Sequence, residues 1–174
     1  MKELDAMLKA FRDATDELHW TGPWRCIQIP DGDGFTVANP TLTQRCRLLG
    51  IDAPEIADAQ GNPKPHAIIA RDTLRAWAMN VNLDLASDPI QPVIDCYERH
   101  LVWARISGTH LSLNVFQIML GSARVRYDFP TPYTQLLADL ESFTRMRCIG
   151  LWALRPRQTT ILRPIEIREA QSGA

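Results

Sequence analysis

A short acidic turn is the first segment of the chain with side chains suited to chemistry. In Asp31-Gly32-Asp33, two carboxylates flank a glycine, so both can face one hard cation. Taken alone, the tripeptide is more typical of an ordinary hairpin turn, because Asp-Gly is a common turn dipeptide. The turn therefore predicts a metal site only if further ligands lie close to it in the fold.

A second acidic segment, R-L-L-G-I-D-A-P-E, occupies residues 47–55. It has the pattern of a strand that carries Arg47 and ends in the carboxylates Asp52 and Glu55, with Pro54 fixing the backbone between them. Asp52 is suited to bind a cation while Glu55 activates a water molecule, as in metal-assisted hydrolysis. The alternative is a strand end with solvent-exposed acids, which is the commoner case for this segment alone.

Two later segments combine aromatic residues with arginine. Arg99 follows Tyr97 by two positions, at the tip of an expected turn where a guanidinium can clamp a phosphate. Tyr127 follows Arg124 and Arg126, and such mixtures stack bases and hold the nucleic-acid backbone. A surface turn and an edge strand with core aromatics are the simpler explanations of each segment in isolation.

A small barrel is expected to position these residues. Apolar periodicity predicts helices over residues 2–18, 66–78, 113–120 and 134–148, and strands over residues 25–30, 35–38, 44–51, 81–86, 93–97 and 101–107. This order favours an α+β fold with a five-stranded, OB-fold-like β-barrel, about three helices and an extra N-terminal helix. The first helix is expected to dock by one face, with a partner-binding arm as the alternative.

Two packing details follow from the same patterns. Alternation along residues 25–30 predicts Ile27 and Ile29 on one face of a strand, and Cys26 on the other. Trp152, close to the end of the last predicted helix, is expected to fill the core.

Composition favours a single globular domain. The chain has 174 residues, 45% of them hydrophobic, and its net charge of −1 excludes a bulk polycation that coats DNA. All basic residues after position 98 are arginines, whose planar forks match phosphate, although a solvated helix face explains them equally well. The cysteines lack zinc spacing, and neither a leader nor a membrane span is predicted, so a cytoplasmic location is expected.

Together these motifs resemble one known family. Asp-Gly-Asp, R-L-L-G-I-D-A-P-E and Tyr-x-Arg, followed by a Gly-terminated helix and a Gly-x-Trp ending, resemble the thermonuclease (staphylococcal nuclease-like) family over about residues 26–152. The resemblance implies a nuclease-like domain over residues 25–153. An N-terminal helical extension over residues 1–24 and a C-terminal tail over residues 154–174 lie outside it.

The resemblance also implies a role for each matching residue. The implied ligands of calcium, or of another divalent ion, are Asp33, Asp52 and the backbone carbonyl of Ala53, with Asp31 in support. Glu55 is implied as general base, and Arg47 and Arg99 as the residues that hold the scissile phosphate. The expected substrate-binding residues are Tyr97, Tyr127, Arg124 and Arg126.

The implied activity is hydrolysis of DNA, RNA or both, with water attacking phosphorus and leaving a 3′-phosphate. Little sequence preference is expected, because contacts to phosphate do not read bases. The alternative is a catalytically weak or inactive module that binds nucleic acid or protein. Two departures bear on this choice: Gly34 stands where the family usually has Thr, and Glu98 where it commonly has Gly. The oligomeric state is left open.

Overall fold

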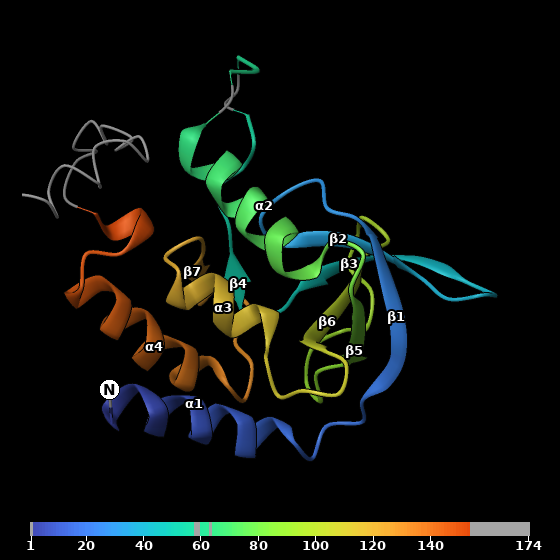
Figure 1. The fold of residues 1–174 in the computed structure, drawn as a ribbon, viewed down its shortest axis with the longest axis horizontal. Coiled ribbons are helices and arrows are strands. Elements are labelled where there is room, and N and C mark those ends of the chain that lie inside the picture. The colour runs from blue at the N-terminus through green and yellow to red at the C-terminus, as the bar shows by residue number, and fades with distance from the viewer. Residues whose placement is uncertain (1, 58–59, 63, 154–174) are drawn as a thin grey trace, which may run out of the picture.

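The structure, a computed structural model, describes residues 2–57, 60–62 and 64–153 and has an α+β fold (Figure 1). Its five main strands form a closed barrel in the order β1-β2-β3-β6-β5, which confirms the expected barrel. All neighbours are antiparallel except β3 and β6, which run parallel. The strands are β1 (Thr21–Gln28), β2 (Gly34–Ala38), β3 (Thr43–Leu48), β5 (Asn82–Ala86) and β6 (His100–Ile106).

Helices cover one side of the barrel, and a second, two-stranded sheet lies beside them (Figure 1). The helices are α1 (Lys2–Thr15), α2 (Pro65–Ala78), α3 (Leu113–Met119), α4 (Thr134–Met146) and the short 3-10 turn η1 (Gly150–Trp152). The small sheet pairs β4 (Ile51–Asp52) with β7 (Arg124–Val125). The expected strand over residues 93–97 is reduced to a single bridge between Ile94 and His100.

The N-terminal helix packs against its own chain, because α1 lies along α4 (Figure 1). Its residue Phe11 is only 4% exposed and meets the rings of Trp103 and Tyr133 edge to face, at centroid distances of 5.8 and 6.1 Å. The barrel strand β1 begins at Thr21, ahead of the expected domain start at residue 25. Residues 154–174, expected to be a tail, lie outside the described residues.

The expected alternation in β1 is wrong. Cys26 and Ile29 are fully buried, whereas Ile27 is 42% exposed. The reason is a break in register between Cys26 and Gln28, where the pairing of β1 with β2 shifts as in a β-bulge. An extra residue at such a point reverses which side chains face inward, and the sequence pattern alone does not reveal it.

Trp152 does not fill the core as expected. It is half-buried, and its ring lies between two guanidinium groups, at 3.9 Å from that of Arg145 and 5.2 Å from that of Arg124. The centre of the core is filled instead by residues of the barrel and α4, among them the fully buried Trp103, Phe35 and Leu140.

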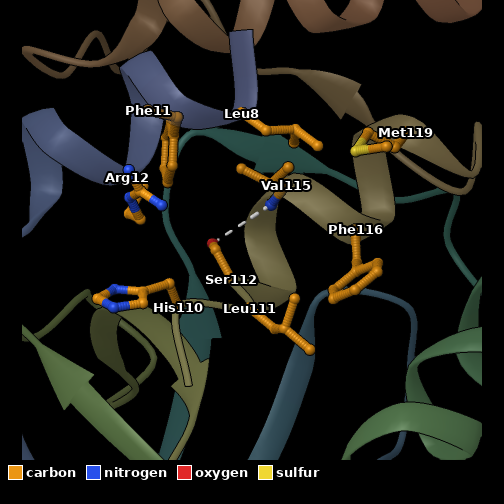
Figure 2. Close-up of a pocket in the computed structure, with 9 residues that line it drawn as sticks. All are labelled: Leu8, Phe11, Arg12, His110, Leu111, Ser112, Val115, Phe116 and Met119. Atoms are coloured by element: carbon orange, nitrogen blue, oxygen red, sulfur yellow. Dashed lines mark hydrogen bonds between the residues drawn. The ribbon is translucent and has the colours of Figure 1, made fainter. Parts of the chain in front are cut away.

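An apolar cavity of about 350 Å³ separates α1 from α3 (Figure 2). Leu8 of α1 and Val115 and Met119 of α3 line it, and Ser112 uses its hydroxyl to cap α3 by accepting from the Val115 amide. Its surface is mostly apolar, with Arg12, His110 and Ser112 as the polar residues of the lining, and it contains no carboxylate. Without a carboxylate, the lining lacks the acidic oxygen ligands that calcium prefers.

Candidate active site

Asp33 lies in the turn between β1 and β2, immediately before the first residue of β2. It is 3% exposed, and both of its carboxylate oxygens accept hydrogen bonds. Oδ1 accepts from Nη1 of Arg47 at 2.9 Å, and Oδ2 accepts from the backbone amide of Ala53 at 2.7 Å. Asp33 therefore ties the turn to β3 and to the segment that follows β4.

Arg47 is the next to last residue of β3 and connects two different carboxylates. Its side chain is 8% exposed, and its two Nη atoms donate to Asp33 at 2.9 Å and to Asp52 at 2.8 Å. The Asp52 side chain is 57% exposed, so Arg47 links a buried acid to one at the surface. The predicted convergence of Asp33, Arg47 and Asp52 is thus present in the fold.

The charges of this cluster are compatible with a bound cation. Burial raises the pKa of Asp33 to about 6, although the guanidinium of Arg47 and the amide of Ala53 oppose the shift. One guanidinium between two carboxylates leaves an excess of negative charge, and the oxygen ligands suit a hard ion such as calcium. Across the described residues, no group of three or more His, Cys, Asp or Glu side chains converges. The protein would supply only part of the coordination shell.

Asp31 has a different role from Asp33. Its Oδ1 accepts from the backbone amides of Asp33 and Gly34, so the carboxylate shapes the turn. A Cβ built at Gly34 would lie 2.5 Å from that oxygen. A larger residue at this position would therefore require the flexible end of the Asp31 side chain to shift.

Arg99 is held at the end of a tight turn by Asp95. The Asp95 carboxylate accepts from Nε and Nη2 of Arg99 at 2.9 and 2.8 Å, and from the backbone amides of Tyr97 and Arg99. Glu98 adopts a left-handed conformation with φ of 61°, the kind that glycine favours. The turn therefore keeps a glycine-like backbone shape although Glu98 replaces the family's common Gly.

A cleft of about 360 Å³ brings most of the predicted residues together. Glu55 is exposed there, and within the described part of the chain it has no hydrogen-bond or ion-pair partner. A mostly apolar pocket of about 330 Å³ adjoins the cleft and shares Arg47, Tyr97, Arg99 and Arg126 with it. The complete lining of the cleft is Arg45, Arg47, Asp52, Glu55, Tyr97, Arg99 and Arg126.

Two predicted substrate-binding residues are not among those that line the cleft. Arg124 pairs with Asp52 in the β4–β7 register, but its guanidinium lies over the ring of Trp152. Tyr127 is 59% exposed, and burial together with the nearby Glu141 raises the pKa of its hydroxyl. Arg126 does line the cleft, where it is paired with Asp128.

Sequence reasoning missed two residues of this site. Asp95 could have been found from its spacing, because it lies four positions before Arg99 across a turn. Arg45 could have been found from strand periodicity, because it lies two positions before Arg47 on the same strand and shares its face. Both signals depend on knowing that the turn of residues 95–99 lies beside β3.

A closed five-stranded barrel with carboxylates and arginines in one surface cleft defines a nuclease-like module. The model of the family described as staphylococcal nuclease homologue matches residues 45–154, and the chain belongs to this family. The resemblance expected from the motifs is thereby confirmed. A comparison with curated proteins found no match. In the described residues, no helix is both long enough and apolar enough to cross a membrane.

Proposed function

We propose that the protein is a calcium-dependent phosphodiesterase that hydrolyses DNA, RNA or both with little sequence preference. Another divalent ion is the alternative cofactor. The observation that carries the proposal is the meeting of Arg47, Arg99, Asp52 and Glu55 in one cleft, where Arg47 also forms an ion pair with the buried Asp33. A barrel with a purely structural role does not require two arginines and two acidic residues in one solvent-accessible cleft.

Arg47 and Arg99 are suited to hold the scissile phosphate. A guanidinium has five N–H donors, and the contacts to Asp33 and Asp52 occupy one donor on each Nη atom of Arg47. The remaining donors are available to phosphate oxygens. Hydrolysis increases the negative charge on those oxygens, and oriented donors stabilise it more strongly than water does. Loss of one such donor typically lowers the rate by about 10²–10³-fold.

Glu55 is suited to accept the proton of the attacking water, because its carboxylate is exposed in the cleft and unpaired among the described residues. The water oxygen bonds to phosphorus, and the bond from phosphorus to the 5′ oxygen breaks. The 5′ oxygen takes up a proton from solvent, Glu55 releases its proton to solvent, and the products carry a 3′-phosphate and a 5′-hydroxyl. Asp33, Asp52 and the carbonyl of Ala53 would hold the calcium ion, with Asp31 keeping the turn in shape. When bound, the ion would supply Lewis-acid stabilisation of the phosphate charge.

The remaining proposed contacts divide by position. Tyr97 and Arg126 line the cleft and would contact the substrate there. Arg124 and Tyr127 lie outside the lining and would contact only a strand that extends beyond the cleft. We assign the nuclease-like domain to residues 21–153 instead of the expected 25–153, because the barrel strand β1 begins at Thr21, and we assign the residues before it to the N-terminal extension.

The test is cleavage of single-stranded DNA and RNA by the purified protein with calcium, with magnesium or with a chelator. Glu55→Gln is the diagnostic variant. Glu98→Gln is the matched control, because it removes one carboxylate near Arg99 that does not line the cleft. We expect calcium-dependent cleavage that is lost in Glu55→Gln and retained in Glu98→Gln, with unchanged circular dichroism spectra for both.

Two outcomes would reject the proposal. Cleavage that survives Glu55→Gln would assign the proton transfer to another group or the activity to a contaminant. Binding of the nucleic acid without cleavage in any metal would favour the alternative, a nuclease-like module that binds but does not hydrolyse.

A further inference from the structure

Arg45 lies in the cleft beside the residues proposed to hold the scissile phosphate. It belongs to β3, two positions before Arg47, and the buried Cys46 between them faces the core. Residues two apart on a strand share a face and lie about 6.6–7 Å apart. Arg45 is exposed and lines the same cleft as Arg47 and Arg99. Its side chain therefore leaves the backbone one strand repeat before that of Arg47.

The pairing of Arg45 differs from that of the other arginines in the cleft. Arg47 is paired with Asp33 and Asp52, Arg99 with Asp95, and Arg126 with Asp128. Arg45 has no carboxylate partner among the residues that the structure describes. Within the described residues, its guanidinium makes one polar contact, a long hydrogen bond of 3.5 Å from Nη1 to the backbone carbonyl of Tyr97.

We propose that Arg45 binds the phosphate next to the scissile one, so that the cleft holds two successive phosphates of a strand. The inference rests on the proposed function. Two observations support it: the guanidinium has unused donors, and the offset of its side chain along β3 is of the order that separates successive phosphates in an extended strand. Arg45 lines only the polar cleft and not the adjoining apolar pocket. The second phosphate therefore lies on the side of the cleft away from that pocket.

This position makes Arg45 a determinant of substrate length. A dinucleoside monophosphate has a single phosphodiester and gives Arg45 nothing to bind. An oligonucleotide has the neighbouring phosphate, and the contact of this phosphate with Arg45 raises its affinity for the protein. An exposed ion pair of this kind changes affinity by about 5-fold at most. Each phosphate contact to a single strand also adds about 0.7 to the slope of log affinity against log salt.

The experiment compares Arg45→Ala with the wild type on a dinucleoside monophosphate and on a hexanucleotide. Arg25→Ala is the matched control, because Arg25 is also an exposed barrel-strand arginine without a carboxylate partner in the described chain, but it lines no part of the cleft. We expect Arg45→Ala to raise KM for the hexanucleotide by up to about 5-fold and to lower its salt slope by about 0.7. Its kcat/KM on the dinucleotide stays unchanged, and Arg25→Ala changes neither substrate.

The outcomes separate this inference from the proposed function. Equal losses on both substrates would place Arg45 at the scissile phosphate or in the fold, and no loss on either would remove it from binding; both results overturn the inference. If the wild type cleaves neither substrate, the proposed function fails, and the inference is decided by binding of the hexanucleotide. Weaker binding by Arg45→Ala than by Arg25→Ala then supports the second phosphate contact, and equal binding rejects it.

Discussion

Arg47 donates a hydrogen bond of 2.9 Å to the carboxylate of Asp33, and both side chains are at least nine-tenths buried. The same guanidinium bonds Asp52 at the surface. Removal of one partner from a buried ion pair leaves the other charge without compensation, whereas removal of an exposed partner costs little. The two contacts of Arg47 should therefore differ strongly in their effect on stability.

We expect Arg47→Met to lower the free energy of unfolding by about 3 kcal/mol at neutral pH, because Asp33 would stay buried without its cation. Asp52→Asn should change it by less than about 1 kcal/mol. Urea denaturation followed by tryptophan fluorescence measures both. Equal effects of the two substitutions would contradict the distinction between the buried and the exposed contact.

The pairing of Asp95 with Arg99 predicts a pH dependence. Partial burial disfavours the ionised form of Asp95. The hydrogen bonds from the Arg99 backbone, the Arg99 guanidinium and the Tyr97 backbone outweigh burial, so the pKa lies below its ordinary value of 3.8. The unfolded chain takes up the proton at a higher pH than the folded protein does. The stability that Asp95 contributes is therefore complete well above pH 3.8 and is lost as the pH falls through this value toward the lower folded pKa.

Asp95→Asn should lower the free energy of unfolding by about 1 kcal/mol at pH 7, because the amide keeps an acceptor but loses the ion pair. Below pH 3.8 the difference between variant and wild type should shrink as the wild-type carboxyl becomes protonated. Urea denaturation at a series of pH values tests this, and a difference that stays constant down to pH 2 would exclude the linkage.

Much of the candidate site was predictable because its residues occupy short, contiguous motifs. Asp33 lies in a turn, and Asp52 and Glu55 lie at and after a strand end. The local backbone of such segments determines the direction in which their side chains point. The expected barrel followed in the same way from short strands separated by turn residues. These are local properties, and the fold did not alter them.

Other features depended on contacts between distant segments. Arg45 became part of the site because β3 pairs in parallel with β6, through Cys46 and His100, which brings the turn before β6 beside β3. Arg124 does not line the expected site, and its guanidinium instead lies over the ring of Trp152, which follows α4 in the chain. Local patterns contain no information about such pairings, just as they do not reveal the bulge that buried Cys26.

Glu98 should lower the free energy of unfolding of the protein. Its φ of 61° places a side chain in the left-handed region, which costs about 1–2 kcal/mol for most residues other than glycine. We expect Glu98→Gly to raise the free energy of unfolding by about 1 kcal/mol, the gain being reduced by the greater freedom of glycine in the unfolded chain. Glu98→Ala is the matched control, since it removes the carboxylate but keeps the strain. If both variants gain equally in thermal denaturation, charge and not backbone conformation is responsible.

The N-terminal helix should be required for the stability of the barrel. Phe11 is 4% exposed and packs on Trp103 and Tyr133, so Phe11→Ala should lower the free energy of unfolding by about 3–5 kcal/mol. Lys9→Ala, on an exposed part of the same helix, should change it by less than about 0.5 kcal/mol. Chemical denaturation of both variants decides whether α1 is part of the core or a separate arm. If α1 is a separate arm, Phe11→Ala would lower the free energy of unfolding no more than the control does.

Gly121 and Gly150 pack their backbones together where the chain returns after α4. The contact lies two residues before Trp152, so we expect it to position that ring. Gly121 has φ of 61°, its carbonyl accepts from Leu151 at 2.8 Å, and an added Cβ would lie 2.3 Å from the carbonyl oxygen of Ile149. Gly108 has φ of 74° with nothing within 4 Å of an added Cβ. Gly108→Ala should therefore cost only the conformational penalty of about 1 kcal/mol, and Gly121→Ala at least about 1 kcal/mol more, because backbone must move. Equal losses of stability in urea denaturation would mean that the close approach imposes no cost. A larger loss in Gly121→Ala, with tryptophan fluorescence altered in that variant alone, would show that the backbone contact holds Trp152 against its two arginines.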